Sequence, residues 1–279
     1  MNHQQICFIG SGNMATSLIG GILANGYSAS NITACDIVEE KLTGLSARFG
    51  INTTAESLEA VESADIVILA VKPQVMQMAC EHLANADIKA DCLFISIAAG
   101  IRESAIDRWL GNDRAIVRCM PNTPALVQLG ATGLHANSSV STEQKGAAQA
   151  ILDAVGITVW LEQESELDAV TAISGSGPAY FFYFIELLQQ SGENLGLTRE
   201  TALLLAKQTA LGAASMAQNG DVVQLRTQVT SKGGTTEKAI LSLQQNGFAS
   251  ILDIATRAAR DRSIEMAHQT DSSGPVNKS

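Results

Sequence analysis

A glycine-rich segment near the N-terminus has the spacing of a dinucleotide-binding loop. The segment reads Gly10-Ser11-Gly12-Asn13-Met14-Ala15, and it follows an apolar run and opens a helical pattern. In this GxGxxA form the first glycine permits a tight turn, the second lets the backbone approach a pyrophosphate, and the small last residue allows close packing of helix on strand. Free amides at the helix N-terminus then face the phosphates. The segment therefore predicts a dinucleotide site.

Asp36 stands where such folds bind the ribose, 24 residues after the second glycine of the motif and at the end of the next predicted strand. A carboxylate there accepts hydrogen bonds from the ribose hydroxyls of NAD and repels a 2′-phosphate. Glu39 and Glu40 add to that repulsion, which Lys41 and the more distant Arg48 could offset. These residues favour NADH, and a turn-capping role for Asp36 is the alternative.

Three further segments follow predicted strands and carry small or polar residues. They are Val71-Lys72-Pro73, Ser96 to Gly100 and Met120 to Pro124. The carboxyl ends of parallel strands share one edge of an open α/β sheet, where ligands bind. Small side chains at Ala98 and Ala99 would leave room for a flat ring, although they could also serve packing alone. The expected cofactor-binding residues are Ile9, Gly10, Ser11, Gly12, Asn13, Met14, Asp36, Ala70, Val71, Lys72, Pro73, Ala98, Ala99 and Asn122.

A second polar segment, Thr230 to Thr236, lies between two predicted helices and has the composition of an anion-binding loop. Gly233 and Gly234 free successive amides to point at one anion, and several hydroxyls and a helix N-terminus converge on the same place. A carboxylate fits such a nest, and a phosphate would have Lys232 as its local cation. An ordinary interhelical loop is the alternative.

Histidines and metal ligands do not enter these motifs. The four histidines lie outside every segment described above, so no histidine is placed as the general acid that carbonyl reduction usually employs. No cluster of histidine, cysteine or carboxylate has metal-ligand spacing, and no metal is expected. The cysteines lack CxxC spacing and sit mostly in apolar runs, which predicts reduced core thiols. They are Cys7, Cys35, Cys80, Cys92 and Cys119.

The elements that must position these segments alternate between strand and helix over about the first 160 residues. Strands that are apolar throughout indicate a sheet covered on both faces, so we expect an α/β, Rossmann-type, doubly wound parallel sheet. The predicted strands are Ile6 to Gly10, Ile32 to Asp36, Ile66 to Val71, Leu93 to Ile97, Ala115 to Cys119 and Ile157 to Leu161. The predicted helices are Asn13 to Asn25, Glu39 to Phe49, Gln74 to Ala84, Glu103 to Leu110 and Thr142 to Val155, with Thr142 as a candidate N-cap.

From about Glu164 the apolar residues recur at helical spacing, which predicts an all-α C-terminal domain. Ser174 to Pro178 is expected to be a loop before a buried helix, whose aromatic residues Tyr180 to Phe184 belong to a core or an interface. The expected limits are 1–162 for the dinucleotide-binding domain, 163–269 for the helical domain and 270–279 for a disordered tail. The predicted helices are Tyr180 to Leu197, Arg199 to Gln218, Thr236 to Gln245 and Phe248 to His268.

The length, composition and net charge limit what kind of protein this chain can be. A chain of 279 residues with 46% apolar and 16% charged residues is expected to fold as about two domains. The formal charge of -10 has the wrong sign for a surface that attracts nucleic acid phosphates. No signal peptide is visible, and the most apolar stretch, Ala169 to Leu188, contains glycines and a proline, so we expect a cytoplasmic protein without a membrane span.

In order and approximate spacing, the motifs resemble those of the pyrroline-5-carboxylate reductase family along nearly the whole chain. The segments that carry the resemblance are Gly10 to Ala15, Val71 to Pro73, Ser96 to Gly100, Met120 to Pro124, Ser174 to Tyr180 and Ser231 to Thr236. The resemblance implies a helical domain that intertwines with a partner subunit in a homodimer, sometimes within a ring of dimers. It also implies reduction of 1-pyrroline-5-carboxylate to L-proline with NADPH or NADH, the substrate lying between the domains near the dimer interface.

The resemblance further implies residue roles. Thr236 is the catalytic residue that would hydrogen-bond the ring nitrogen, and the residues expected to bind substrate are Ser231, Gly233, Gly234, Thr235 and Thr236. A cyclic imine is more basic than a ketone and can arrive protonated, so hydride can reach it without a strong protein acid. Many family members carry a small hydroxylated residue or a phosphate-tolerant loop where this chain has Asp36. The family tendency implies NADPH whereas Asp36 favours NADH, so the expected cofactor is NADPH or NADH.

Two other functions stay open. A 3-hydroxyacid dehydrogenase-like oxidoreductase also joins a Rossmann domain to a helical domain, and its lysine would be Lys207, which lacks a flanking glycine-rich pattern. A non-catalytic dinucleotide-sensing regulator would recruit a partner through the helical domain, but it would not need the carboxylate nest at Ser231 to Thr236.

Overall fold

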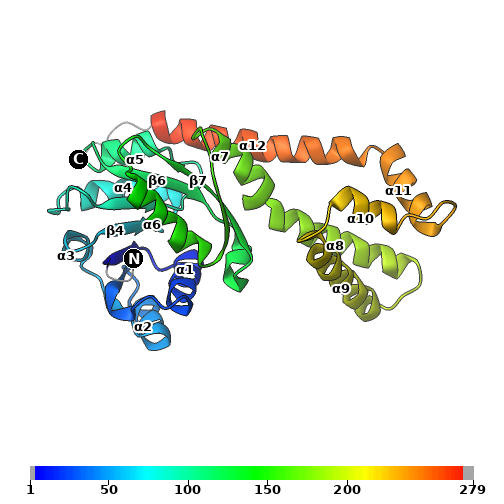
Figure 1. The fold of residues 1–279 in the computed structure, drawn as a ribbon, viewed down its shortest axis with the longest axis horizontal. Helices are drawn as coiled ribbons and strands as arrows, with labels where there is room; N and C mark the ends of the chain where they lie inside the picture. The colour runs from blue at the N-terminus through cyan, green and yellow to red at the C-terminus, as the bar shows by residue number, and fades with distance from the viewer. Residues whose placement is uncertain (1–3, 273–279) are drawn as a thin grey trace. The chain divides into compact units, whose positions relative to one another are not determined.

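The computed structural model describes residues 4–272, and within this range the chain forms two compact units. The first comprises the chain up to Ser176 together with the chain from Ala259 onward, and the second comprises Gly177–Ala258. Figure 1 shows the helices and strands in chain order by colour.

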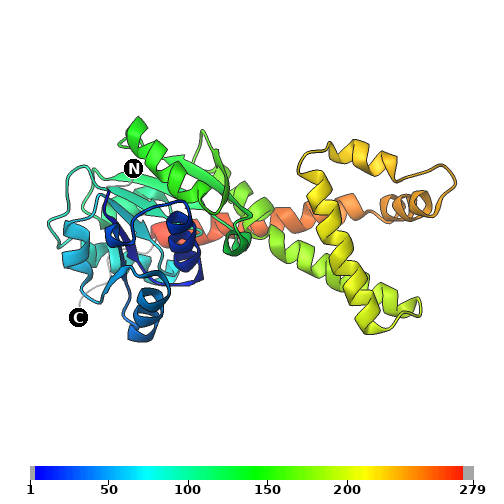
Figure 2. The same cartoon turned by 60° about the horizontal axis from the view of Figure 1, so that its bottom comes forward.

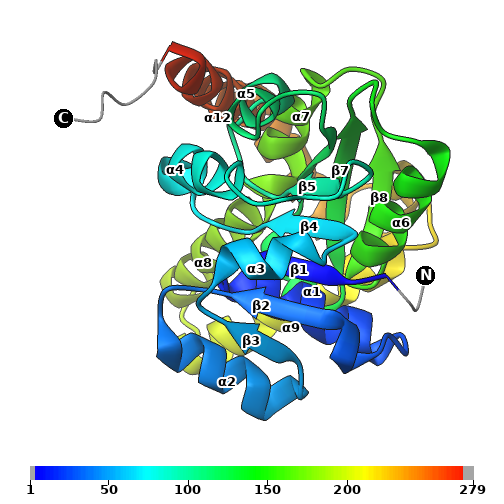
Figure 3. The same ribbon diagram turned by 90° about the vertical axis from the view of Figure 1, so that its left-hand side faces the viewer.

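The first unit is built on one eight-stranded sheet with the strand order β3-β2-β1-β4-β5-β6-β7-β8, seen in Figure 3. Neighbouring strands are parallel except for β6 and β7, which are antiparallel. Because β1 lies between β2 and β4, the winding reverses there, and ligands bind outside the carboxyl ends at such a switch point. The strands are β1 (Ile6–Ile9), β2 (Ile32–Cys35), β3 (Asn52–Thr54), β4 (Ile66–Leu69), β5 (Leu93–Ser96), β6 (Ala115–Met120), β7 (Gly130–Ala136) and β8 (Gly156–Trp160).

Helices cover both faces of this sheet because its central strands are apolar on both sides. In β1, Ile6 and Phe8 enter one hydrophobic core while Cys7 and Ile9 enter the other. The first core is shared with α1 (Asn13–Ala24), α2 (Glu39–Phe49) and α6 (Thr142–Asp153). The second is shared with α3 (Ser57–Glu62), α4 (Pro73–Leu83) and α5 (Glu103–Trp109). The prediction of a doubly wound α/β domain is confirmed.

Strands β3 and β7 and helix α3 were not predicted. β3 has three polar residues, and β7 carries two glycines that indicate a loop in sequence. Both glycines are required by close packing: a Cβ on Gly130 would lie 2.9 Å from the Val155 carbonyl oxygen, and one on Gly133 would lie 2.9 Å from Val170 Cγ2. Tertiary contacts therefore decide that this segment is a strand.

The proposed N-cap of α6 was one residue off. The helix is capped by Ser141, whose Oγ accepts the Gln144 N–H at 3.1 Å while Gln144 Oε1 accepts the Ser141 N–H at 2.9 Å. This reciprocal pair is a capping box, so Thr142 is the first helical residue instead of the cap. Two adjacent hydroxyl residues look alike in sequence, and the spacing to Gln144 distinguishes them.

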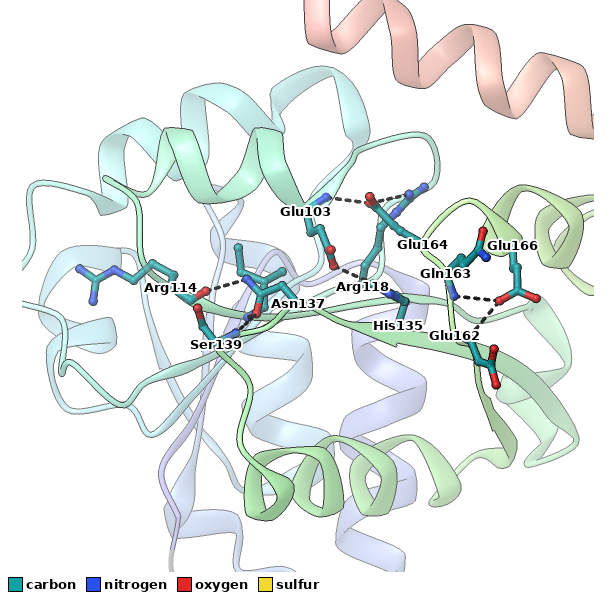
Figure 4. A network of polar contacts seen from close by, with 11 residues as sticks. Glu103, Arg114, Arg118, His135, Asn137, Ser139, Glu162, Gln163, Glu164 and Glu166 are labelled. Carbon is teal, nitrogen blue, oxygen red and sulfur yellow. Dashed lines mark hydrogen bonds and ion pairs between the residues drawn. The ribbon is translucent and has the colours of Figure 1, made fainter.

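A network of partly buried polar side chains joins β6, β7, α5 and the segment after β8, as Figure 4 shows. Arg118 on β6 is 3% exposed and donates from Nη1 to Glu164 Oε1 at 2.9 Å. The same Glu164 oxygen accepts the Glu103 N–H at 2.8 Å, and Glu103 Oε2 lies 3.1 Å from His135 Nδ1. The network binds the antiparallel strand β7 to the helix on that face, through residues far apart in the chain.

The segment Ser174 to Pro178 is helical, and the loop expected there is wrong. Helix α7 (Glu166–Val170) continues through a π-helical turn, Thr171–Gly175, into α8 (Gly177–Asn194). The Ser176 N–H donates to the Thr171 carbonyl five residues earlier, at 2.8 Å. A Cβ on Gly175 would lie 2.6 Å from Met120 Cε, so a larger residue there would displace the end of the Met120 side chain. A proline one residue into a helix removes an N–H that has no intrahelical acceptor, so it does not interrupt the helix.

The second unit is all helical, as predicted (Figure 2). It holds α8, α9 (Arg199–Ala217), α10 (Val222–Gln228), α11 (Thr235–Gln245) and the first part of α12 (Phe248–Ser272). Helix α8 packs against α9 where Gly192 meets Ala202, a crossing that small residues permit. The short α10 was missed, although Asp221 caps it by accepting the Gln224 N–H at 2.8 Å.

Helix α8 is not buried within one copy of the chain, contrary to expectation. Phe181 is 70% exposed and Phe182 67% exposed, and further large apolar side chains of α9 and α12 are exposed in the same unit. Of the two places expected for the aromatic run, a core or an interface, only the interface is compatible with this exposure.

The last helix is longer than expected, and all five cysteines are free thiols. Helix α12 extends to Ser272, so residues 270–272 of the expected tail are helical, and residues 273–279 lie outside the described range. No helix between residues 4 and 272 is long and apolar enough to cross a membrane. All five cysteines are free and buried, and burial raises the pKa of the Cys80 and Cys92 thiols to about 12.

Candidate active site

The loop between β1 and α1 has the backbone that its glycines predict. Gly10 has φ +98°, and a Cβ there would lie 2.7 Å from the carbonyl oxygen of Ala70, directly after β4. Gly10 also donates its N–H to the Cys35 carbonyl at 2.8 Å. The first glycine is therefore required by its backbone conformation and by the two neighbouring strands.

The space in front of this loop fits a dinucleotide pyrophosphate. Gly12 is the N-cap of α1, and no atom lies within 4 Å of a Cβ built on it. Ser11 is 6% exposed, and its Oγ is one of the buried polar atoms that find no partner among the described residues. Asn13 and Met14 form the first turn of α1, whose free amides attract an anion. An open cradle, an unpaired hydroxyl and a helix N-terminus together fit a phosphate group.

Asp36 follows β2 and points toward the glycine loop. Its Oδ2 accepts the Ser11 N–H at 2.9 Å, and its Oδ1 accepts the Val38 N–H at 3.0 Å. Lys41 Nζ lies 3.1 Å from Oδ2. Burial by itself would raise the pKa of Asp36, but the two backbone donors and Lys41 outweigh it and hold the pKa below its usual range. The carboxylate is charged and already bonded on both oxygens.

The other predicted cofactor residues lie at the same edge of the sheet. Ala70, Val71, Lys72 and Pro73 follow β4, while Ala98 and Ala99 follow β5, and β4 is the neighbour of both β1 and β5. Val71 Cγ1 lies 3.1 Å from a Cβ built on Gly10, so the end of β4 adjoins the glycine loop. Lys72 is exposed and caps α4, in which Pro73 is the first residue.

Asn122 lies after β6 at the same edge but uses its side chain internally. It is 8% exposed, its Nδ2 donates to the Ser174 carbonyl at 3.0 Å, and its Oδ1 accepts the Ala131 N–H at 2.9 Å. The amide thus ties the loop after β6 to the π-helical turn and to β7. Because both ends of its side-chain amide are bonded within the protein, Asn122 can contribute to cofactor binding only by holding that loop in shape.

A cavity at the opposite edge of the sheet is a poor candidate for this cofactor. It has a volume of about 770 Å³ and lies at the amino ends of β4, β5 and β6. Four carboxylates line it, and a dinucleotide carries negative phosphates that such a cavity would repel. They belong to Asp65, Asp91, Asp113 and Glu143.

The predicted substrate-binding residues lie together on one loop of the second unit, at the start of α11. Gly233 has φ +76°, and a Cβ on Gly234 would lie 2.5 Å from Ser231 Oγ. Gly233 is therefore required by its backbone conformation, while a side chain at Gly234 would displace the Ser231 hydroxyl, whatever the loop binds. Thr235 and Thr236 are the first two residues of α11, so their amides have no carbonyl one turn earlier to bond. The arrangement presents N–H donors beside the Thr236 hydroxyl position.

Glu237 is a residue of this loop that the sequence analysis missed. Its Oε2 accepts the Gly233 N–H at 2.7 Å, so a carboxylate oxygen already occupies one of the amides of the predicted nest. Glu237 lies three residues after the N-cap Gly234, which is the spacing of the glutamate in a capping box, although its bond goes to the residue before the cap. Glu237 therefore occupies the Gly233 amide, and the Thr235 and Thr236 amides are left to bind a ligand.

A histidine and a lysine that could transfer a proton lie outside both the cofactor-binding and the substrate-binding residues. His135 pairs with Glu103 on the buried network, and Lys207 is exposed on α9. The described structure thus brings the cofactor residues together in the first unit and the substrate residues together in the second.

Two family profiles match the chain. The profile described as pyrroline-5-carboxylate reductase dimerisation matches residues 164–266, and that described as NADP oxidoreductase, coenzyme F420-dependent, matches residues 5–100. Among curated proteins, the pyrroline-5-carboxylate reductase of Pseudomonas aeruginosa is 51% identical over 271 residues, which cover 96% of this chain and 99% of that protein.

Solved structures agree with these matches. The pyrroline-5-carboxylate reductase of Coxiella burnetii superposes with a TM-score of 0.90 at 44% identity, covering 95% of this chain and 98% of that one. The Plasmodium falciparum enzyme, crystallised with NADP bound, has a TM-score of 0.83 at 31% identity and covers 96% and 99% of the two chains.

Proposed function

This chain belongs to the pyrroline-5-carboxylate reductase family, and from that membership we propose how its own residues carry the reaction. The enzyme reduces the cyclic imine 1-pyrroline-5-carboxylate to L-proline with NADH or NADPH. The observation that carries the assignment of roles is the start of α11, where the first two amides lie beside the Thr236 hydroxyl position.

The chemistry needs little acid catalysis from the protein. The ring nitrogen of the imine is basic enough to be protonated before hydride arrives, and the electrons of the C=N π bond then move onto nitrogen as the new C–H bond forms. The nicotinamide, when bound, supplies that hydride. The residues of the chain must hold the imine carbon within about 3 to 3.5 Å of the hydride donor and keep the ring in one orientation.

The glycine loop and the neighbouring strand ends would hold the dinucleotide. In this proposal the α1 amides and the Ser11 hydroxyl bind the pyrophosphate, while Ala98 and Ala99 border a flat ring without filling its space. Support comes from the unpaired Ser11 Oγ and the open space in front of Gly12. The other residues of this half would be Ile9, Gly10, Asn13, Met14, Asp36, Ala70, Val71, Lys72, Pro73 and Asn122.

The loop before α11 would hold the substrate. The Thr235 and Thr236 amides and Ser231 would bind the carboxylate, with Gly233 and Gly234 permitting the turn, and the Thr236 hydroxyl would accept the N–H of the protonated ring. Support for a carboxylate as the ligand comes from the Thr235 and Thr236 amides, which have no carbonyl one turn earlier to bond, while Glu237 occupies the Gly233 amide.

Substitution of Thr236 tests this assignment. A hydrogen bond to a charged group is worth roughly 1.5 to 3 kcal/mol, so Thr236→Ala should lower kcat/KM for 1-pyrroline-5-carboxylate about ten- to hundredfold. The dinucleotide affinity should stay near that of the wild type. Ser242→Ala removes a hydroxyl from the same helix two turns further on and serves as the matched control. Unchanged kcat and KM in Thr236→Ala would show that this loop does not hold the substrate.

Self-association is part of the same proposal. The match to a dimerisation profile and the exposed aromatic side chains of α8 support a homodimer formed through the helical segment, and we propose a ring of dimers as its larger form.

We propose 1–162 and 163–269 as the functional domain limits, supported by the profile that begins at residue 164. The five free, buried thiols support a reducing compartment such as the cytoplasm.

A further inference from the structure

The Asp36 carboxylate is already saturated with donors. Its side chain is 8% exposed, and both oxygens accept a backbone N–H, Oδ2 from Ser11 and Oδ1 from Val38. Lys41 Nζ adds contacts of 3.1 Å to Oδ2 and 3.4 Å to Oδ1. A ribose hydroxyl approaching this group would compete with donors that hold the glycine loop in place. This arrangement fits a positioning role for Asp36.

Lys41 changes the electrostatics of the turn after β2. Its ammonium lies in contact with the carboxylate, so the two formal charges cancel at short range. The lysine side chain is 47% exposed, and an ammonium has three N–H donors, so it can bond Asp36 and a second anion together. Glu39 and Glu40, on the same first turn of α2, are exposed, and charges there are screened by solvent.

From this geometry we propose that Lys41 is the specificity-determining residue that accepts the 2′-phosphate of NADPH, held at the glycine loop by Asp36. The inference rests on the proposed placement of the dinucleotide at Gly10 to Met14. In folds of this class the residues directly after the second strand lie at the ribose 2′ position, and a cation there accommodates a 2′-phosphate. A phosphate monoester would then lie against one ammonium whose position is set by the Asp36 carboxylate.

Nucleotide fragments test the proposal without turnover. Calorimetric titration compares 2′,5′-ADP with 5′-AMP, which differs from it only by lacking the 2′-phosphate, in the wild type and in Lys41→Gln. Loss of one charge-assisted contact to the phosphate should raise the Kd for 2′,5′-ADP about tenfold relative to that for 5′-AMP. Lys41→Arg keeps the charge and should retain most of the wild-type discrimination.

The matched control is Arg48→Gln, which removes one positive charge from the exposed end of the same helix, where the guanidinium stacks over Phe49. It should leave the ratio of the two dissociation constants unchanged. In steady-state assays, the ratio of kcat/KM for NADPH to that for NADH should fall with Lys41→Gln by a similar factor.

The possible results are distinguishable. An unchanged ratio in Lys41→Gln, with both fragments still binding, would overturn the role of Lys41 and leave the glycine loop in place. An equal loss of preference for the 2′-phosphate in Lys41→Gln and Arg48→Gln would also overturn the role of Lys41. The cause would then be the overall positive charge of the helix. Failure of the wild type to bind either fragment would instead refute the proposed dinucleotide placement.

Discussion

Gly10 and Gly12 are two residues apart, and the structure requires them for different reasons. Gly10 has a backbone conformation that side chains disfavour, and it lies against the Ala70 carbonyl. Gly12 has φ −77° and ψ −178°, which any residue adopts, and its Cβ position is open. The first glycine serves the fold and the second keeps space for a ligand.

We therefore predict opposite outcomes for substitutions at the two glycines. Gly12→Val should fold with a Tm within a few degrees of the wild type, yet lose dinucleotide binding by at least about a hundredfold, because the branched side chain fills the space of the pyrophosphate. Gly10→Ala should lower the Tm through strain and contact with Ala70. Thermal unfolding by circular dichroism and fluorescence titration with NADH and NADPH measure both. Wild-type affinity in a folded Gly12→Val protein would contradict the placement.

At the scale of elements, the network of Glu103, Arg118, His135 and Glu164 holds helix α5 against two antiparallel strands. Burial and the nearby Glu164 charge raise the pKa of Glu103, and the contact with His135 offsets this only in part. A carboxyl group whose pKa is higher in the folded protein than in the unfolded chain contributes stability at low pH. That contribution is lost as the pH rises from about the ordinary value of 4.5 through the raised pKa.

Glu103→Gln should reveal this pH dependence, because glutamine cannot titrate. The free energy of unfolding of the variant, minus that of the wild type, should increase as the pH rises from 4 to 7. Urea denaturation of both proteins at several pH values measures the difference. Glu143→Gln is the control, since Glu143 is exposed on α6 and has no part in the network. A difference that falls with rising pH would show that the carboxylate is stabilised, and not penalised, in the folded protein.

At the scale of the whole molecule, the helical unit exposes more apolar surface than a single copy can shield. The exposed aromatic residues of α8 include Phe181, Phe182 and Tyr183. Large contiguous apolar surfaces on a folded protein mark interfaces, and a match to a dimerisation profile covers this helix. Self-association therefore completes the burial that the sequence requires of this part of the chain.

A charge placed on this surface should separate the copies. Phe181→Asp would bury an unpaired carboxylate in the interface, which costs several kcal/mol per copy, so the association constant should fall by at least about a hundredfold. Sedimentation velocity at micromolar concentration measures the change. Met78→Asp alters an equally exposed apolar residue on α4 of the other unit and should leave association intact. A wild-type protein that is a compact, active monomer under these conditions would refute the prediction.

The sequence by itself determined the features that depend on local pattern. Apolar strands such as Ile66–Leu69 indicate a sheet covered on both faces, helical spacing after Glu164 indicates that the rest of the chain is helical, and the spacing of glycines identifies both loops. Each of these signals is contained within a few consecutive residues, because strand, helix and turn preferences act over short distances along the chain.

Only the tertiary structure decided the features that depend on residues far apart in sequence. β7 is a strand because Gly130 and Gly133 allow close approach of Val155 and Val170, and Ser174 lies in a π-helical turn bonded to Asn122. Likewise, the sequence placed Asp36 near a ribose, but its hydrogen bond to Ser11 and its ion pair with Lys41 exist only once β1, β2 and α2 are assembled. A side chain has a limited number of hydrogen-bonding positions, and folding determines which partners fill them.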